Sequence, residues 1–161
     1  MTTAFKLIPA LTILLLFSCT TNNKEVISTW KDGATKLERI HSDTPNVYIE
    51  REFYENGQLA SETRFQNSKQ NGKSLSYYKD GNLLGVAYYR DGKINGEVLE
   101  YHKNGSPMFK GTQTNGELIG KAVHYYENGK PRTELFYKNN QRLVINQWDS
   151  SGKLLTDQDI K

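Results

Sequence analysis

The chain has few of the residues on which small exported domains and most enzymes depend. Its 161 residues include 1 Cys, 4 Pro, 2 Met and 2 Trp, and only 36% of them are hydrophobic. A single cysteine excludes both an intramolecular disulfide and a zinc site built from thiolates. So small an apolar fraction disfavours a large two-layer enzyme fold, which needs a deep core.

The chain also lacks a large excess of either positive or negative charge. The 21 Lys and Arg residues nearly balance the 18 Asp and Glu residues, which leaves a formal net charge of +3. A charge this small gives no general reason to expect a nucleic-acid partner. We therefore expect no nucleic-acid binding. No segment beyond the N terminus keeps the apolar periodicity of a helix, so we also expect no helical domain.

The one long apolar run lies at the N terminus. Lys6 is followed by the mostly apolar residues 7–17, and then by Ser18 and Cys19. A run of this length behind one positive charge is typical of a secretory signal, whereas a membrane-spanning helix needs roughly 20 residues. We therefore predict that the protein is exported and that residues 1–18 are its signal peptide.

The end of this segment resembles the lipobox of bacterial lipoproteins, with Leu16 at position −3, Ser18 at −1 and Cys19 at the cut. The resemblance implies that Cys19 becomes the acylated first residue of the mature chain. A plain cleavable signal with an incidental cysteine is the alternative. Residues 19–25 then form the lipidated cysteine and a polar tether, and two or more acyl chains hold a protein stably on a bilayer. The expected location is the bacterial cell envelope, on the outer membrane or cell surface rather than in the cytoplasm.

The remaining residues, 26–161, form a repeat with a period of 24 residues. Two series of glycines follow this step: Gly33, Gly57, Gly81, Gly105 and Gly129, with Gly152 after 23 residues, and then Gly72, Gly96 and Gly120. An aromatic residue stands four positions before most glycines of the first series, at Phe53, Tyr77, Tyr101, Tyr125 and Trp148. A fixed period of this length indicates one small structural unit repeated along the chain.

Each repeat contains two turn signals. The first is Asn56-Gly57 and its equivalents, and the second is Asp91-Gly92, Asn115-Gly116 or the variant Asn139-Asn140. Such pairs favour tight hairpins, either type I′ or with a glycine bulge. Because the runs between them have the length and composition of strands, we predict an all-β fold. It is a single elongated antiparallel β-meander of about five 24-residue hairpin repeats.

Alternation along the strands assigns side chains to two faces. One face carries Leu75 with Tyr77, Leu99 with Tyr101, and Val123 with Tyr125, and we expect this face to be covered. The other face carries Glu52, Tyr54, Ser76, Tyr78, Glu100, His102, His124 and Tyr126, and we expect it to be wet.

The Tyr-Tyr-x-Asn/Asp-Gly unit with its second turn resembles the variant MORN repeat of bacterial proteins, over about residues 30–155. Many proteins of that kind are described as antitoxin components of toxin–antitoxin modules, and many carry lipoprotein signals. The resemblance implies a protein partner, which includes the possibility of a toxin. MORN-type hairpins also occur in protein-binding, lipid-associated and structural arrays, so the resemblance is more specific for fold than for function.

Few residues look catalytic. His102 and His124 should be separated by a whole strand, roughly 10 Å, which is too far to share a metal ion. Glu52, Glu62, Glu100 and Glu134 are better explained by cross-strand ion pairs on a solvated sheet than by paired catalytic carboxylates. We therefore predict no catalytic residue, no metal site and no cofactor.

One row of rings is the best candidate for a contact surface. It consists of Tyr54, Tyr78, His102 and Tyr126, which repeat about every two strands, on the order of 10 Å, and could stack on an extended peptide or glycan. The alternative is that these rings reflect strand propensity with partial burial. The sequence thus predicts a membrane-anchored, non-enzymatic module for protein binding, of the antitoxin or immunity kind. A structural protein that contacts peptidoglycan or another glycan is the alternative.

Overall fold

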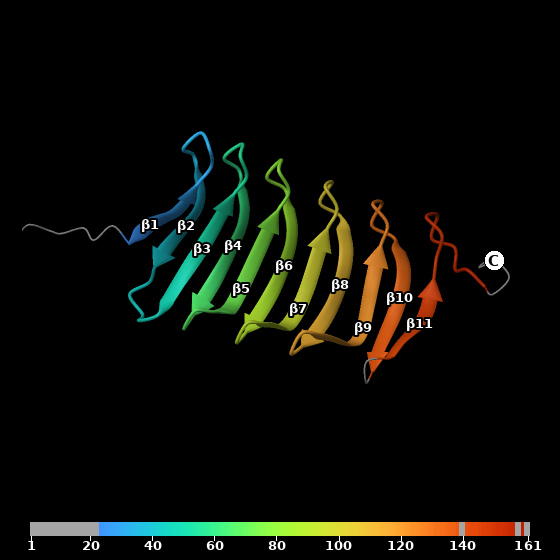
Figure 1. Ribbon diagram of the computed structural model, residues 1–161. Helices are drawn as coiled ribbons and strands as arrows, with labels where there is room; N and C mark the ends of the chain where they lie inside the picture. Colours follow the sequence, from blue (N-terminus) through green and yellow to red (C-terminus); the bar gives the residue numbers. More distant parts are fainter. Residues whose placement is uncertain (1–22, 139–140, 157–158, 160–161) are drawn as a thin grey trace, which may run out of the picture.

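The part of the chain that the structure describes is a single open sheet of eleven antiparallel strands (Figure 1). The computed structural model describes residues 23–138, 141–156 and 159. Each strand pairs with the next one along the chain, so the predicted all-β meander is confirmed. No described segment forms a helix long and apolar enough to cross a membrane. Residues 1–22, with the predicted signal peptide and Cys19, lie outside the described residues.

The strands are six to nine residues long, close to the predicted length. They are β1 (Lys24–Thr29), β2 (Thr35–His41), β3 (Val47–Phe53), β4 (Leu59–Gln66), β5 (Lys69–Tyr77), β6 (Leu83–Arg90), β7 (Lys93–Tyr101), β8 (Pro107–Thr114), β9 (Glu117–Tyr125), β10 (Pro131–Lys138) and β11 (Gln141–Gln147).

The two turn signals of each repeat form two different turns at opposite edges of the sheet. At the upper edge in Figure 1, the amide of Gly57 donates to the carbonyl of Tyr54 and the amide of Tyr54 donates to the carbonyl of Gln58, both at 2.9 Å. With φ +80° at Gly57, this is a type I turn closed by a glycine bulge. At the lower edge, Asp91 (φ +51°) and Gly92 (φ +84°) form a type I′ turn. Both predicted geometries therefore occur, each at its own edge; the Asn139-Asn140 turn lies outside the described residues.

The second glycine series lies inside strands, where the register shifts. Gly72 in β5 has φ +112° and Gly96 in β7 has φ +139°. A Cβ atom at Gly96 would lie 3.1 Å from Cβ of Tyr88 on the neighbouring strand. Two constraints therefore favour glycine at these positions. Residues with a side chain rarely adopt this backbone conformation, and a side chain of the neighbouring strand passes close to the glycine.

The prediction of which face is covered was wrong over β7 to β10, where the core lies. The buried residues Val98, Phe109, Ala122 and Leu135 form the core, and they lie on the face that carries Glu100 and His124, called face A below. The opposite face, face B, carries Leu75, Leu99 and Val123, which are only partly buried, and it buries Val47 and Glu38 near the N-terminal end of the sheet. Among the described residues no second layer covers either face, so a side chain is buried only where neighbours on its own face cover it.

Phe109 shows how a single layer builds a core. Its ring leans along β8 over Gly111. A Cβ atom at Gly111 would lie only 2.7 Å from Cζ of Phe109, so this position has room for glycine alone. In this position Phe109 is 7% exposed, packed with Val98 and Ala122 from the flanking strands. The burial of Phe109 thus depends on its ring lying over a glycine, an arrangement that Leu75 and Leu99 on face B lack.

Replacing Phe109 by Ala should lower the free energy of unfolding by about 3 kcal/mol, because it removes the largest side chain of the core. Phe136→Ala on the adjacent β10 is the matched control. Phe136 lies on face B and is 40% exposed, so its loss should cost below about 1 kcal/mol. Urea unfolding of both variants measures the difference, and equal losses would show that face A is not the stabilising face.

Candidate binding surface

The aromatic row proposed as a contact surface joins each upper turn to the next. The hydroxyl groups of Tyr54, Tyr78 and Tyr126 donate to the backbone carbonyls of Tyr77, Tyr101 and Trp148, at 2.7, 2.8 and 2.8 Å. His102 contacts the carbonyl of Tyr125 through Nε2 at 3.1 Å, and Trp30 donates to the carbonyl of Phe53 at 3.2 Å. We call these five contacts the turn ladder.

Asparagine side chains add a second series of bonds at the same edge. The Nδ2 groups of Asn56, Asn104 and Asn128 donate to carbonyls one repeat later, at 3.0, 2.8 and 2.7 Å. Their Oδ1 atoms accept from the amide two residues ahead within the same turn. Where the turn has Asp80, whose carboxylate cannot donate, Asn82 donates instead to the carbonyl of Lys103 at 3.1 Å. The asparagines therefore serve as bridges between turns as well as turn formers.

The turn ladder ends at Asp149, which stands where the earlier repeats have a ring. Its carboxylate accepts hydrogen bonds from the side chain and amide of Ser151 and from the amide of Lys153. These bonds, led by the Ser151 hydroxyl, hold the pKa of Asp149 below its ordinary value. The last turn is thus closed by its own residues.

Contact of the aromatic row with a partner stays a prediction. The rings of Tyr54, Tyr78, His102 and Tyr126 are half-buried, and their polar atoms bond to the backbone. The Lys79 and Lys103 ammonium groups and the Arg132 guanidinium lie 5.8 Å from the ring centroids of Tyr54, Tyr78 and Tyr126. The partial burial of the row agrees with the structural alternative, and its hydrogen bonds to the next turn were not predicted from the sequence.

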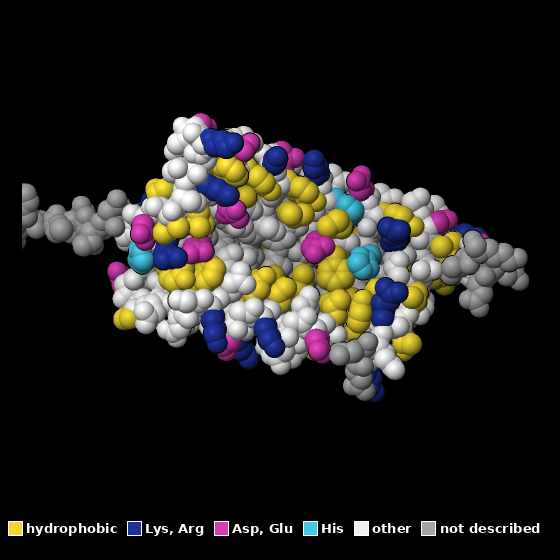
Figure 2. All heavy atoms as spheres, viewed as in Figure 1, with side chains coloured by type: hydrophobic (Ala, Val, Ile, Leu, Met, Phe, Trp, Pro, Cys, Tyr) yellow, Lys and Arg dark blue, Asp and Glu magenta, His cyan; other side chains and the backbone are white. Residues whose placement is uncertain are grey.

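Face A contains a hollow that the sequence reasoning also missed. It lies over β4, β5 and β6, where two rows of cross-strand neighbours contain only small side chains: Ser61, Ser76 and Gly85 in one row, and Thr63, Ser74 and Ala87 in the other. We call these six residues the central hollow. Figure 2, which views face A, shows the depression in the middle of the sheet.

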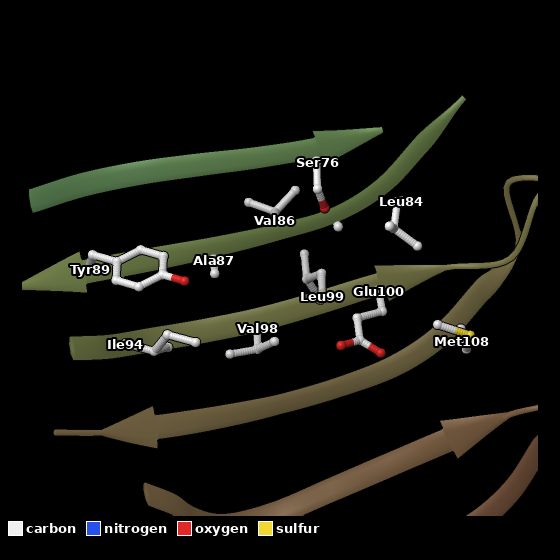
Figure 3. Close-up of a pocket in the computed structure, with 11 residues that line it drawn as sticks. Ser76, Leu84, Val86, Ala87, Tyr89, Ile94, Val98, Leu99, Glu100 and Met108 are labelled. Atoms are coloured by element: carbon white, nitrogen blue, oxygen red, sulfur yellow. The ribbon is translucent and has the colours of Figure 1, made fainter. Parts of the chain in front are cut away.

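The central hollow arises because one large residue is missing from each of two strands. In the equivalent positions, β8 has Phe109 with Gly111 and β10 has Thr133 with Leu135. The cavity over β5 to β8 has a volume of about 350 Å³ and the neighbouring one over β4 about 180 Å³. Tyr89 and Ile94 lie at one end of the larger cavity, and Leu84 and Met108 at the other (Figure 3).

Two carboxylates flank the central hollow in the row of Ser61, Ser76 and Gly85. Glu52 precedes Ser61 in this row and Glu100 follows Gly85. Both are exposed, and neither is in an ion pair with another described residue. The predicted cross-strand ion pairs are confirmed for Glu62 and Glu134 on face B, each 2.7 Å from its cation, and are wrong for Glu52 and Glu100.

The far side of Glu100 is cationic and aromatic. The imidazole of His124 lies on Phe109, with ring centroids 4.8 Å apart. Burial lowers the pKa of His124, and the nearby Arg132 and Arg142 lower it further against the opposing effect of Glu100. Within the part of the chain that the structure describes, no three His, Cys, Asp or Glu side chains gather as metal ligands.

Comparison with protein families identifies the repeat. Residues 49–67, 70–91, 94–115 and 118–139 match the family described as MORN repeat variant. Together these segments make up more than half of the chain, and the last three begin 24 residues apart. A comparison with curated proteins gave no match.

Tyr78→Phe should lower the free energy of unfolding by about 1 kcal/mol, because it leaves the Tyr101 carbonyl without its hydroxyl donor. Tyr88→Phe is the matched control, since Tyr88 is 42% exposed on the next strand and its hydroxyl makes no bond to a described residue. Thermal unfolding of both variants compares the two hydroxyl groups. A Tyr78 variant as stable as the control would show that the turn ladder contributes nothing measurable.

Proposed function

Because this chain belongs to the MORN repeat variant family, we propose that it is a non-enzymatic module that binds a protein partner on face A. The central hollow carries this proposal. Three adjacent strands there lack the large apolar residues that fill the same face over β8 and β10. A partner side chain seated in the hollow would complete the core that the chain's own sequence leaves unfinished, and burial of apolar surface would drive the contact.

The proposed location is the cell envelope, with the chain anchored through acylated Cys19. Lys24 and Glu25, predicted as the end of the tether, already pair with β2, so the tether would be residues 19–23. These residues would reach roughly 16 Å when extended, so the sheet would stay close to the lipid surface. The partner would then be an envelope or surface protein. A toxin is one such partner, in keeping with the antitoxin role that the family resemblance implies, provided that the two proteins meet outside the cytoplasm.

Contact with a glycan is the second candidate function. It is favoured by the regular spacing of the half-buried rings Tyr54, Tyr78 and Tyr126 along the upper edge. A glycan would stack on ring faces, whereas a protein partner would occupy the hollow. Sedimentation of the full-length protein with isolated cell-wall material, lost when these three tyrosines are replaced by Ala, would favour the glycan role.

The binding proposal is tested by placing a photo-crosslinking residue at position 84 of the full-length protein in cells of its own species. Leu84 lines the cavity on face A, and Tyr88 on the same strand points to face B and serves as the control position. We expect one discrete adduct from position 84, identified by mass spectrometry, and none from position 88. Equal adducts from both positions, or none from either, would contradict binding on face A.

The anchor is tested separately with Cys19→Ser. This change should abolish labelling with radioactive palmitate and move the protein from the membrane fraction to an unprocessed or soluble form, because no other cysteine is present. Thr20→Ser, at the next residue, should leave labelling intact. Labelling that persists in the Cys19 variant would show that the chain is not a lipoprotein of the predicted kind.

A further inference from the structure

The central hollow is matched in chemistry to one kind of ligand. We propose that it binds an extended polypeptide segment in which two apolar side chains lie between two Lys or Arg residues six positions apart. This inference rests on the proposed function and specifies its partner. The apolar side chains enter the hollow, and the two cations pair with Glu52 and Glu100.

The floor of the hollow favours apolar side chains. The hydroxyl groups of Thr63 and Ser74 bond to each other at 2.8 Å, which leaves only one of their two hydrogens without a partner. Gly85 and Ala87 add only backbone and a methyl group. At the ends of the larger cavity, Leu84 and Ile94 are part of an apolar rim. A leucine or phenylalanine would therefore bury its surface there with few unsatisfied polar atoms.

The flanks of the hollow favour cations. Glu52 and Glu100 belong to the same row and are exposed, and no described cation pairs with them. The neighbouring carboxylate of Glu50 is different, because Arg39 binds it at 2.7 Å. Two free carboxylates on either side of a depression lined by small side chains give the surface a charge pattern that a basic segment complements.

The separation of the two carboxylates sets the spacing of the ligand. Four strand-to-strand steps lie between β3 and β7, about 19 Å at ~4.8 Å per step. An extended chain rises ~3.3 Å per residue, so six residues span about the same distance. Side chains at positions 1, 3, 5 and 7 of such a segment point to one side. Cations at 1 and 7 with apolar residues at 3 and 5 therefore match the row and the hollow together.

The probe for this inference is the peptide Lys-Ser-Leu-Ser-Phe-Ser-Lys, labelled with a fluorophore and titrated against the full chain in detergent. The control peptide, Lys-Leu-Ser-Phe-Ser-Ser-Lys, has the same composition, but its apolar residues alternate to the wrong side. Fluorescence anisotropy at low ionic strength should show binding of the probe below 1 mM, taken as roughly the weakest useful affinity. The control peptide should bind at least about tenfold more weakly.

Variants of the chain locate the contact. Glu52→Gln and Glu100→Gln should each weaken probe binding about three- to fivefold, as expected for exposed ion pairs. Glu97→Gln on the same strand as Glu100 is the control, because Glu97 pairs with Lys110 on face B. Ala87→Leu gives β6 the residue that β10 has at Leu135, so it should fill the hollow and abolish binding while the melting temperature is kept.

Three results would overturn the inference: equal binding of the two peptides, no effect of the Glu52 and Glu100 changes, or no binding of the probe up to about 1 mM. The inference and the proposed function fail in different ways. A partner cross-linked from position 84 in cells, but insensitive to Glu52→Gln and Glu100→Gln, would leave the proposed function standing and remove the basic, extended ligand.

Discussion

The structure depends on the hydrogen bond that each upper turn sends to the next one. A single-layer sheet has no second layer to hold its strands in register, so contacts between adjacent repeats supply the stability. The turn ladder provides one such contact per repeat, from Trp30 to Tyr126, and its acceptors are the backbone carbonyls 22 or 23 residues later. The period of 24 residues follows from this geometry, because an insertion or deletion within a repeat would move the acceptor away from its donor.

The turns and strands could be predicted from the sequence because their causes are local. Asn-Gly and Asp-Gly pairs place a turn at a given point of the chain, and the spacing between them determines strand length. The type of turn is less local, because Asn56-Gly57 forms a glycine-bulge turn and Asn115-Gly116 a type I′ turn. The covered face could not be predicted in the same way. Its position depends on Phe109 lying over Gly111 and between Val98 and Ala122 from two other strands. Alternation within one strand carries no information about that arrangement.

The candidate site was only partly visible in the sequence. Tyr54 and Tyr78 are periodic, but periodicity alone does not separate a ring that stacks on a ligand from a ring whose hydroxyl bonds the next turn. The central hollow can be recognised in the sequence when the repeats are aligned, because small residues then stand opposite large ones. Gly85 and Ala87 stand where the later strands have Phe109 or Leu135. A comparison of large and small residues between equivalent positions would have located the missing part of the core.

Stability and the proposed binding surface lie in different parts of each repeat. The turn ladder runs along the upper edge past β4, β5 and β6, so these strands stay in register although face A has no core of its own there. Such an arrangement allows face A to vary in sequence without loss of the fold. A repeat sheet stabilised along its edge can therefore leave apolar positions unfilled in its middle, where a partner gains the most by filling them.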